Sequence, residues 1–493
     1  MREYSPKRRT ALVLTGSGTA AAYHAGVVKA LDESGVKVDV VVGSGAGTIA
    51  AAFSAIAGSA RLYGEDGFWA GVRWRSFYRL RLAARTALLL VASSYGLFLL
   101  PLVLAIVGFV LFLPALIADW FLPGTFARLI GQLAAAPAVV RGPYLGALTV
   151  PVFALCVLAT VAALRLFVRD RRRFTESLES LLDAERGRDR LSRALWEIAR
   201  GPALSDAPPA EAELGRRYVA LAAENLGQPG FRELILRVAD LETGGALAFV
   251  LLQDAHRNSF AASRSRGPRS RVEGMPDAID LRAPGGDGLF FDAVMTGLLP
   301  PLVAPVRRVA FPKGGLYGGE THRLTDATLV SGCGLGEALA AGAEQVIVVS
   351  PTSEEPAPPT RRRGPRAQAD GALALLERQA VDRDVAQAER INRMIQTLGH
   401  DTATGRAWQD PATGRLYRDF ALYIVRPERR GLGPLEWDGA RDPATEVLET
   451  PEDLIERGYK DAYRLFVEPI VGAAPEPRRA TLAPLPEHQP VGL

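Results

Sequence analysis

Cysteine and lysine, two residue types that often carry structure or chemistry, are scarce in this chain of 493 residues. Its two cysteines are Cys156, in an uncharged stretch, and Cys333, in a glycine-rich stretch. Two cysteines in such different surroundings provide neither a disulfide framework nor a zinc site, and the five histidines lack metal-ligand spacing. We therefore expect no metal and no cofactor.

Lysine accounts for five of the 58 basic residues, and the rest are arginines. With alanine, glycine and proline abundant, this pattern is typical of a GC-rich, bacterial genome, so the arginine count does not indicate nucleic-acid binding. The net charge is only +4, and no nucleic-acid-binding module is recognisable. The opening "MREYSPKRRTALVLTG" has an apolar run of four residues, too short for a signal peptide. We expect a cytoplasmic start.

Two long segments contain no charged residue, namely 86–118 with 33 positions and 142–164 with 23. A helix needs roughly 20 apolar residues to cross the hydrocarbon core of a bilayer. We therefore predict two transmembrane helices, at about 94–116 and 144–165. The alternative interpretation is a pair of buried core helices.

Arginines flank this hairpin on both sides, five in 73–85 and five in 165–173. The connection between the two runs contains only Arg128 and Arg141, offset by Asp119. The positive-inside rule then predicts that both ends are cytoplasmic, and hence an inner-membrane protein with a cytoplasmic domain. The stretch before the hairpin also contains aromatic residues, and we interpret it as lying along the anionic inner leaflet or, alternatively, as a solvated surface helix.

The hairpin divides a soluble domain into two parts, 1–72 and 210–472. Between these parts lie the membrane-associated segment, 73–173, and a charged helical connector with a linker, 174–209. A disordered tail is predicted for 473–493. No internal repeat is recognisable.

The first part reads as alternating strands and helices. "ALVL" and "VDVVVG" are near-continuous apolar strands, each followed by a glycine turn and a helix of small residues, at about 20–34 and 47–57. "GLGEALAAGAEQVIVVSP" adds a further helix and strand. Apolar strands alternating with helices predict an α/β fold with three layers, α/β/α, around a mostly parallel sheet.

Several ordered motifs resemble the patatin-like phospholipase family over about 300 residues. "LVLTGSGTAAAYHAGVVKAL" is similar to that family's oxyanion loop, and "GSGAGTIAAA" to its G-x-S-x-G nucleophile elbow. "LTDATLVSGCGLGEALAAGAEQVIVV" is similar to the segment that carries its catalytic aspartate. "LILRVADLETGGALAFVLL", "DAVMTGLLPPLVAP" and "EDLIERGYKDAYRLF" match its remaining hairpin, proline-containing segment and closing helix.

The resemblance implies a Ser-Asp dyad that cleaves acyl esters of lipids, but this chain departs from the pattern. The nucleophile position is Gly45, the base position is Asp326, and the oxyanion loop is formed by Gly16, Ser17 and Gly18. Glycine offers no nucleophile, alanines replace two further residues of the oxyanion loop, and the family's D-G-G reads "DAT" here. Asp326 then persists either as a base or as a buried polar residue.

Two alternatives for this glycine-rich region remain. Ser44, one residue before the elbow apex, is a candidate replacement nucleophile, although a side chain there points away from the direction of the apex. Ser17 is a weaker candidate. "GSGTAA" also fits a dinucleotide-binding fingerprint, but the next strand has no acidic residue at its tip to hold a ribose.

The sequence as a whole therefore predicts a membrane-anchored patatin-like protein that has lost hydrolase activity. We expect it to bind membrane lipids or a protein partner at the former active site, with no nucleic-acid partner. The alternative is an active phospholipase or lipid acyl hydrolase that uses Ser44 with Asp326. The oligomeric state does not follow from the sequence.

Overall fold

The computed structural model describes two units of the chain, one comprising Met1–Tyr78 with Ala184–Leu493 and the other Arg79–Asp183. The residues described are 4–18, 20–81, 85, 124, 128, 180, 182–200, 207–262, 276–301, 303–327, 330, 332–353, 365–398, 407–409, 416–428, 431–436, 440–441 and 448–468. In the second unit, β3 (Arg79–Leu80) pairs antiparallel with β4 (Leu182–Asp183). All the elements that follow belong to the first unit.

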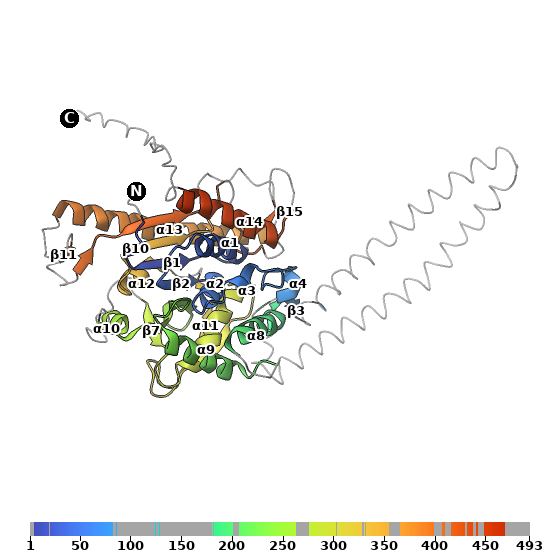
Figure 1. Ribbon diagram of the computed structural model, residues 1–493. Helices are drawn as coiled ribbons and strands as arrows, with labels where there is room; N and C mark the ends of the chain where they lie inside the picture. The colour runs from blue at the N-terminus through green and yellow to red at the C-terminus, as the bar shows by residue number, and fades with distance from the viewer. Residues whose placement is uncertain are drawn as a thin grey trace, which may run out of the picture. The chain divides into compact units, whose positions relative to one another are not determined.

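A nine-stranded sheet with the order β13-β10-β1-β2-β5-β6-β7 forms the centre of the first unit (Figure 1). The pairs along this path are parallel except for β5 with β6, and β9 pairs antiparallel with both β5 and β8. The expected α/β fold with a mostly parallel sheet is therefore present. The strands are β1 (Thr10–Leu14), β2 (Val40–Ser44), β5 (Glu233–Asp240), β6 (Gly245–Leu251), β7 (Asp277–Asp280), β8 (Arg307–Ala310), β9 (Thr321–Thr325), β10 (Gln345–Val349) and β13 (Ala421–Val425).

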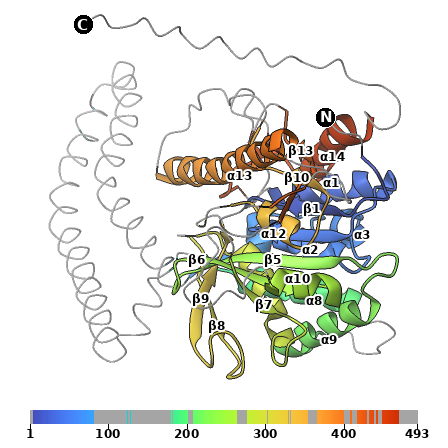
Figure 2. The ribbon, with the colours of Figure 1, turned by 90° about the vertical axis from the view of Figure 1, so that its left-hand side faces the viewer.

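The central strands are buried along their whole length because helices cover both faces of the sheet. On one face, alternate residues of β1, β2 and β10 pack with α12 and α13 in one hydrophobic cluster. On the other face lie α1 and α2, and α14 packs on α1. Figure 2 shows α13 on one side of the strands and α1 with α14 on the other. This arrangement confirms a three-layer architecture.

The first two helices, α1 (Ala20–Glu33) and α2 (Gly47–Ser54), begin where the sequence places them, directly after glycine turns. They are followed by two short helices, α3 (Ala60–Tyr63) and α4 (Trp74–Phe77). The later helices are α8 (Glu185–Ala199), α9 (Glu211–Asn225), α10 (Asp254–Ala262), α11 (Phe290–Met295), α12 (Leu335–Ala340), α13 (Pro365–Leu398) and α14 (Pro451–Ala462). Short two-stranded pairs join β11 (Ala407–Gln409) to β12 (Leu416–Arg418) and β14 (Ala440–Arg441) to β15 (Leu448–Glu449).

The described residues include no helix that is both long enough and apolar enough to cross a membrane. The two transmembrane helices predicted at about 94–116 and 144–165 lie outside the described residues, as does the predicted tail, 473–493. The membrane hairpin therefore stays a prediction.

Candidate active site

The turn between β2 and α2 is built like a nucleophile elbow, but its apex has no side chain. Gly45 adopts a left-handed backbone conformation with φ of +63°, which costs an L-residue roughly 1–2 kcal/mol and glycine very little. The Thr48 hydroxyl donates to the Gly45 carbonyl at 2.8 Å and fixes the turn. The sharp strand-to-helix turn that would expose a nucleophile is thus retained without the nucleophile.

Asp326 lies directly opposite this apex. A Cβ built on Gly45 would lie 3.0 and 3.2 Å from the two carboxylate oxygens of Asp326. Asp326 follows β9, and the preceding residue, Thr325, holds this end of the strand by donating its hydroxyl to the Leu299 carbonyl at 3.0 Å. The fold therefore brings together the nucleophile and base positions that the sequence motifs indicated, although they are separated by some 280 residues.

The Asp326 carboxylate is bonded to a different serine. Ser17 Oγ donates to Asp326 Oδ2 at 2.7 Å, and both residues are fully buried. A serine hydroxyl at this distance from a carboxylate has the geometry of a nucleophile with its base. Sequence reasoning gave Ser17 less weight than Ser44. The signal that could have identified it is the serine itself, which stands where the family pattern has a glycine.

Ser44 occupies another position at the elbow. It is the last residue of β2, pairs with Arg237 of β5 in the sheet, and lines a pocket together with Gly45. Among the described residues, the serine hydrogen bond to Asp326 comes from Ser17.

The oxyanion loop lies closed against the elbow. The backbone N–H of Ala46 donates to the Gly16 carbonyl at 2.8 Å, whereas in serine hydrolases with this elbow the N–H after the nucleophile stabilises the oxyanion. That carbonyl oxygen would also lie 2.7 Å from a Cβ at position 45. At the start of α1, the N–H of Ala20 donates to the Ser17 carbonyl and the N–H of Ala21 to the Gly18 carbonyl. These donors are therefore directed within the loop, which also weakens the dinucleotide interpretation.

A small pocket of about 250 Å³, partly open to solvent, lies beside the elbow. This volume includes open solvent at the mouth, so the space takes at most part of a lipid and not a whole phospholipid. One wall comes from α13, which contributes a buried acid, Glu377, together with Ala380. The other lining residues are Thr15, Gly16, Ser44, Gly45, Ala327, Val330 and Gly332.

Titratable groups around the site are held in single protonation states by burial. Burial lowers the pKa of His24 to about 4, and its Nε2 lies 3.0 Å from the Thr15 carbonyl, so the neutral ring donates that hydrogen bond. Burial, followed by the charge of Asp326, raises the pKa of Tyr78 well above its usual value. Among the described residues, no group of three or more histidine, cysteine, aspartate or glutamate side chains could hold a metal ion.

A separate polar cluster lies at β9, away from the pocket lining. His322 is nearly buried, with Nδ1 at 2.7 Å from Asp240 Oδ2 and Nε2 at 3.2 Å from Glu320 Oε2. Burial lowers the pKa of His322, but its hydrogen bonds to the two carboxylates outweigh this effect, and the net shift is upward. Asp240 also accepts from the Thr243 hydroxyl at 3.0 Å, which explains the D-x-x-T-G pattern of the β5–β6 turn.

Part of the chain matches a known protein family. Residues 12–143 match the model of the family described as patatin-like phospholipase. The resemblance to patatin-like phospholipases is confirmed. Among solved structures, VipD from Legionella pneumophila is similar at 12% identity and a TM-score of 0.30, over 94% of this chain and 67% of that chain. No curated protein matches the chain.

Proposed function

We propose that this chain is a membrane-anchored patatin-like protein that no longer hydrolyses acyl esters and binds membrane lipid through its patatin-like domain. The observation that carries the proposal is the state of the dyad: Gly45 faces Asp326 without a side chain, and Ser17 donates to the carboxylate instead. Patatin-like phospholipases act on lipids, and this supports a lipid as the ligand.

Three requirements of acyl transfer argue against catalysis at the elbow. The reaction needs a side-chain nucleophile, and Gly45 has none. It needs donors directed at the developing oxyanion, and the Ala46 N–H is bonded to the Gly16 carbonyl instead. It also needs room for the ester at the apex, and the Gly16 carbonyl oxygen lies only 2.7 Å from where a Cβ of residue 45 would stand.

A second candidate function is acyl-ester hydrolysis by Ser17, which the 2.7 Å hydrogen bond to Asp326 favours. In that reaction Asp326 would take the hydroxyl proton while Ser17 Oγ bonds to the ester carbonyl carbon. The alcohol would leave with the proton, and water would then release the fatty acid from Ser17. Because Ser17 is fully buried, this reaction also requires the oxyanion loop to move away from the elbow.

A fluorophosphonate probe separates the two candidates on the full-length protein in membranes. We expect neither covalent labelling nor fatty-acid release from phosphatidylcholine or phosphatidylglycerol. Labelling that disappears in Ser17→Ala and persists in Ser44→Ala would replace the first proposal with the second. The reverse pattern would identify Ser44 as the nucleophile.

Lipid binding is tested by titration with a short-chain phosphatidylglycerol below its micelle concentration. Ala380→Trp places a large side chain in the pocket wall, so we expect it to weaken binding at least tenfold. Ala220→Trp is the matched control because Ala220 is exposed on α9 and does not line the pocket. Equal affinities of the two variants would place the lipid elsewhere.

The membrane anchor follows from the two uncharged runs, and the β3–β4 pair offers a direct way to test it. Leu80 pairs with Leu182, so an Asn-Gly turn between them can replace residues 81–181. We expect the full chain to resist carbonate extraction and the shortened chain to be released. Cysteines placed in 119–141 should react with a membrane-impermeant reagent from outside, and a cysteine at 180 should not. Release of the full chain would refute the anchor.

A further inference from the structure

The long helix α13 presents two very different faces. Leu373, Glu377, Val381, Ala388 and Ile395 are buried at helical spacing against the domain. On the outer side, Leu375 and Leu376 are 56% and 45% exposed. Two adjacent leucines of this helix thus leave about half of their surface open to solvent.

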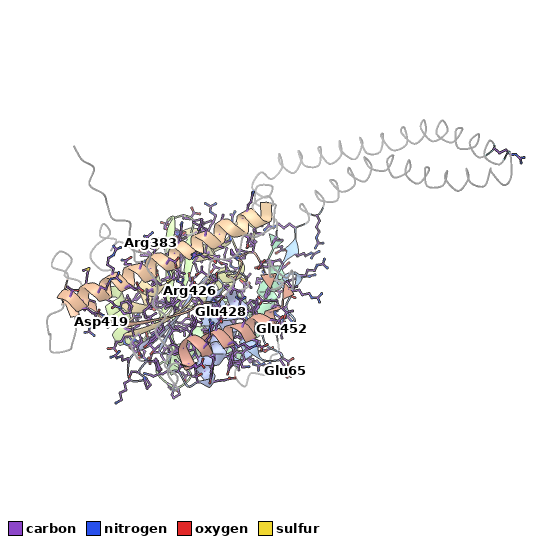
Figure 3. All side chains as sticks on the ribbon, turned by 90° about the horizontal axis from the view of Figure 1, so that it is seen from above. Glu65, Arg383, Asp419, Arg426, Glu428 and Glu452 are labelled. Atoms are coloured by element: carbon purple, nitrogen blue, oxygen red, sulfur yellow. The ribbon has the colours of Figure 1, made fainter. Side chains whose placement is uncertain are left out.

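The charges on the outer side of α13 are mainly positive. Arg383 and Arg390 are exposed and make no ion pair with a described residue. Leu376, Arg383 and Arg390 follow one another at seven-residue intervals, so they lie along one stripe of the helix. Figure 3 shows α13 lying across the domain, with Arg383 on it.

Three acidic residues of this part of α13 are engaged with the domain, and Glu389 pairs with Arg393 of the same helix at 3.6 Å. Asp382 binds Arg426 at 3.0 Å, and Asp384 accepts from the Cys333 N–H at 2.7 Å. Glu377 is buried in the wall of the pocket. The outer stripe therefore combines apolar and cationic side chains while the carboxylates of Glu377, Asp382 and Asp384 are occupied or buried.

We propose that the outer α13 face, defined by Leu375, Leu376, Arg383 and Arg390, docks on an anionic lipid surface. Exposed leucines beside unpaired arginines are typical of helices that lie in the interface of a bilayer with anionic lipids. A second copy of the chain fits this face poorly, because a twofold contact would bring like-charged arginines together.

Docking at this face would place the lipid surface against α13, the helix that forms one wall of the pocket. Glu377 and Ala380, which line the pocket, lie within one turn of Leu376 on the same helix. A lipid surface that binds the outer side of α13 thus lies against the helix that forms one wall of the pocket. This inference concerns a different surface from the predicted hairpin and does not depend on it.

The test uses the full chain with Cys156→Ser, labelled at Leu376→Cys with the environment-sensitive fluorophore NBD. The protein is reconstituted in nanodiscs of phosphatidylcholine alone or mixed with phosphatidylglycerol, with spin-labelled lipid as quencher. We expect a blue shift and quenching in the anionic discs. An interfacial arginine contributes about fivefold to binding, so Arg383→Gln with Arg390→Gln should weaken docking about 25-fold. Label at Leu316→Cys, which replaces an equally exposed leucine (53%), should stay unquenched.

Equal emission from position 376 in both kinds of disc, without quenching, would overturn the proposal. A blue shift that depends on protein concentration and not on lipid would overturn it in favour of a second copy. Failure of the membrane anchor would show separately, as loss of co-elution with the discs. In that case the same labelled chain is titrated with vesicles of phosphatidylcholine alone or mixed with phosphatidylglycerol. A blue shift with quenching in the anionic vesicles alone would support the proposal, and equal emission in both without quenching would overturn it.

Discussion

Ser17 and Asp326 make the strongest test of the site geometry, because their contact has a measurable stability. Ser17→Ala removes the donor of the 2.7 Å bond and leaves the Asp326 carboxylate fully buried. Hydrogen bonds to charged groups contribute about 1.5–3 kcal/mol. We therefore expect Ser17→Ala to lower the free energy of unfolding by about 1.5–3 kcal/mol.

The measurement is urea denaturation of the detergent-solubilised chain, followed by tryptophan fluorescence. Ser44→Ala is the matched control: Ser44 is also buried but the hydrogen bond to Asp326 comes from Ser17, so we expect its substitution to cost less, about 1 kcal/mol or below. Combining Ser17→Ala with Asp326→Ala completes a double-mutant cycle, in which we expect a coupling of about 1 kcal/mol or more. Additive effects, or equal losses for the two serine variants, would refute the interpretation that Ser17 replaced the elbow serine as partner of Asp326.

Three further predictions concern packing and pH. A Cβ at Gly26 would lie 1.9 Å from the Ile455 carbonyl oxygen, where α1 crosses α14, so Gly26→Ala should lower stability by about 3 kcal/mol, measured by thermal denaturation. The pKa of His322 is raised in the folded protein, so its contribution to the free energy of unfolding is complete below the pKa of the unfolded state. That contribution is lost as the pH rises through the pKa of the folded state. The stability difference between the wild type and His322→Gln should therefore shrink as the pH rises above about 6.5, the ordinary pKa of histidine, and a constant difference would contradict the pairing. The pKa of His24 is lowered to about 4, so the unfolded chain takes up a proton first and stability should fall by roughly 1.4 kcal/mol per unit as pH drops from about 6.5. His24→Gln should flatten that slope.

Local patterns in the sequence were sufficient to predict the central strands of the sheet. The apolar runs that form β1, β2 and β10, and the glycine turns that follow the first two, require no knowledge of distant residues. Burial on both faces makes these strands almost uniformly apolar, which is why they stand out. Gly45 could be located because it follows such a strand, whereas Asp326 follows β9, which is largely polar, and was located by the family motif alone.

The hydrogen bonds at the candidate site could not be predicted from local sequence patterns. Ser17 and Asp326 are 309 residues apart, and nothing local to either indicates which hydroxyl the carboxylate binds. The general rule for strand side chains argued against Ser44 but gave no reason to prefer Ser17. Glu377 was missed altogether, because an acid in a charged helix is usually solvated, and only packing against the sheet buries it.

The position of β1 in the sheet has a consequence for the synthesis of the chain. β1 lies between β2 and β10, and about 330 residues separate Leu14 from Gln345. At 5–20 residues per second, β1 waits about 15–65 s before its second neighbour is made. During that time one edge of a largely apolar strand is unpaired, and both uncharged runs emerge from the ribosome before the sheet can close. We therefore expect the nascent chain to need protection of this edge until β10 is made.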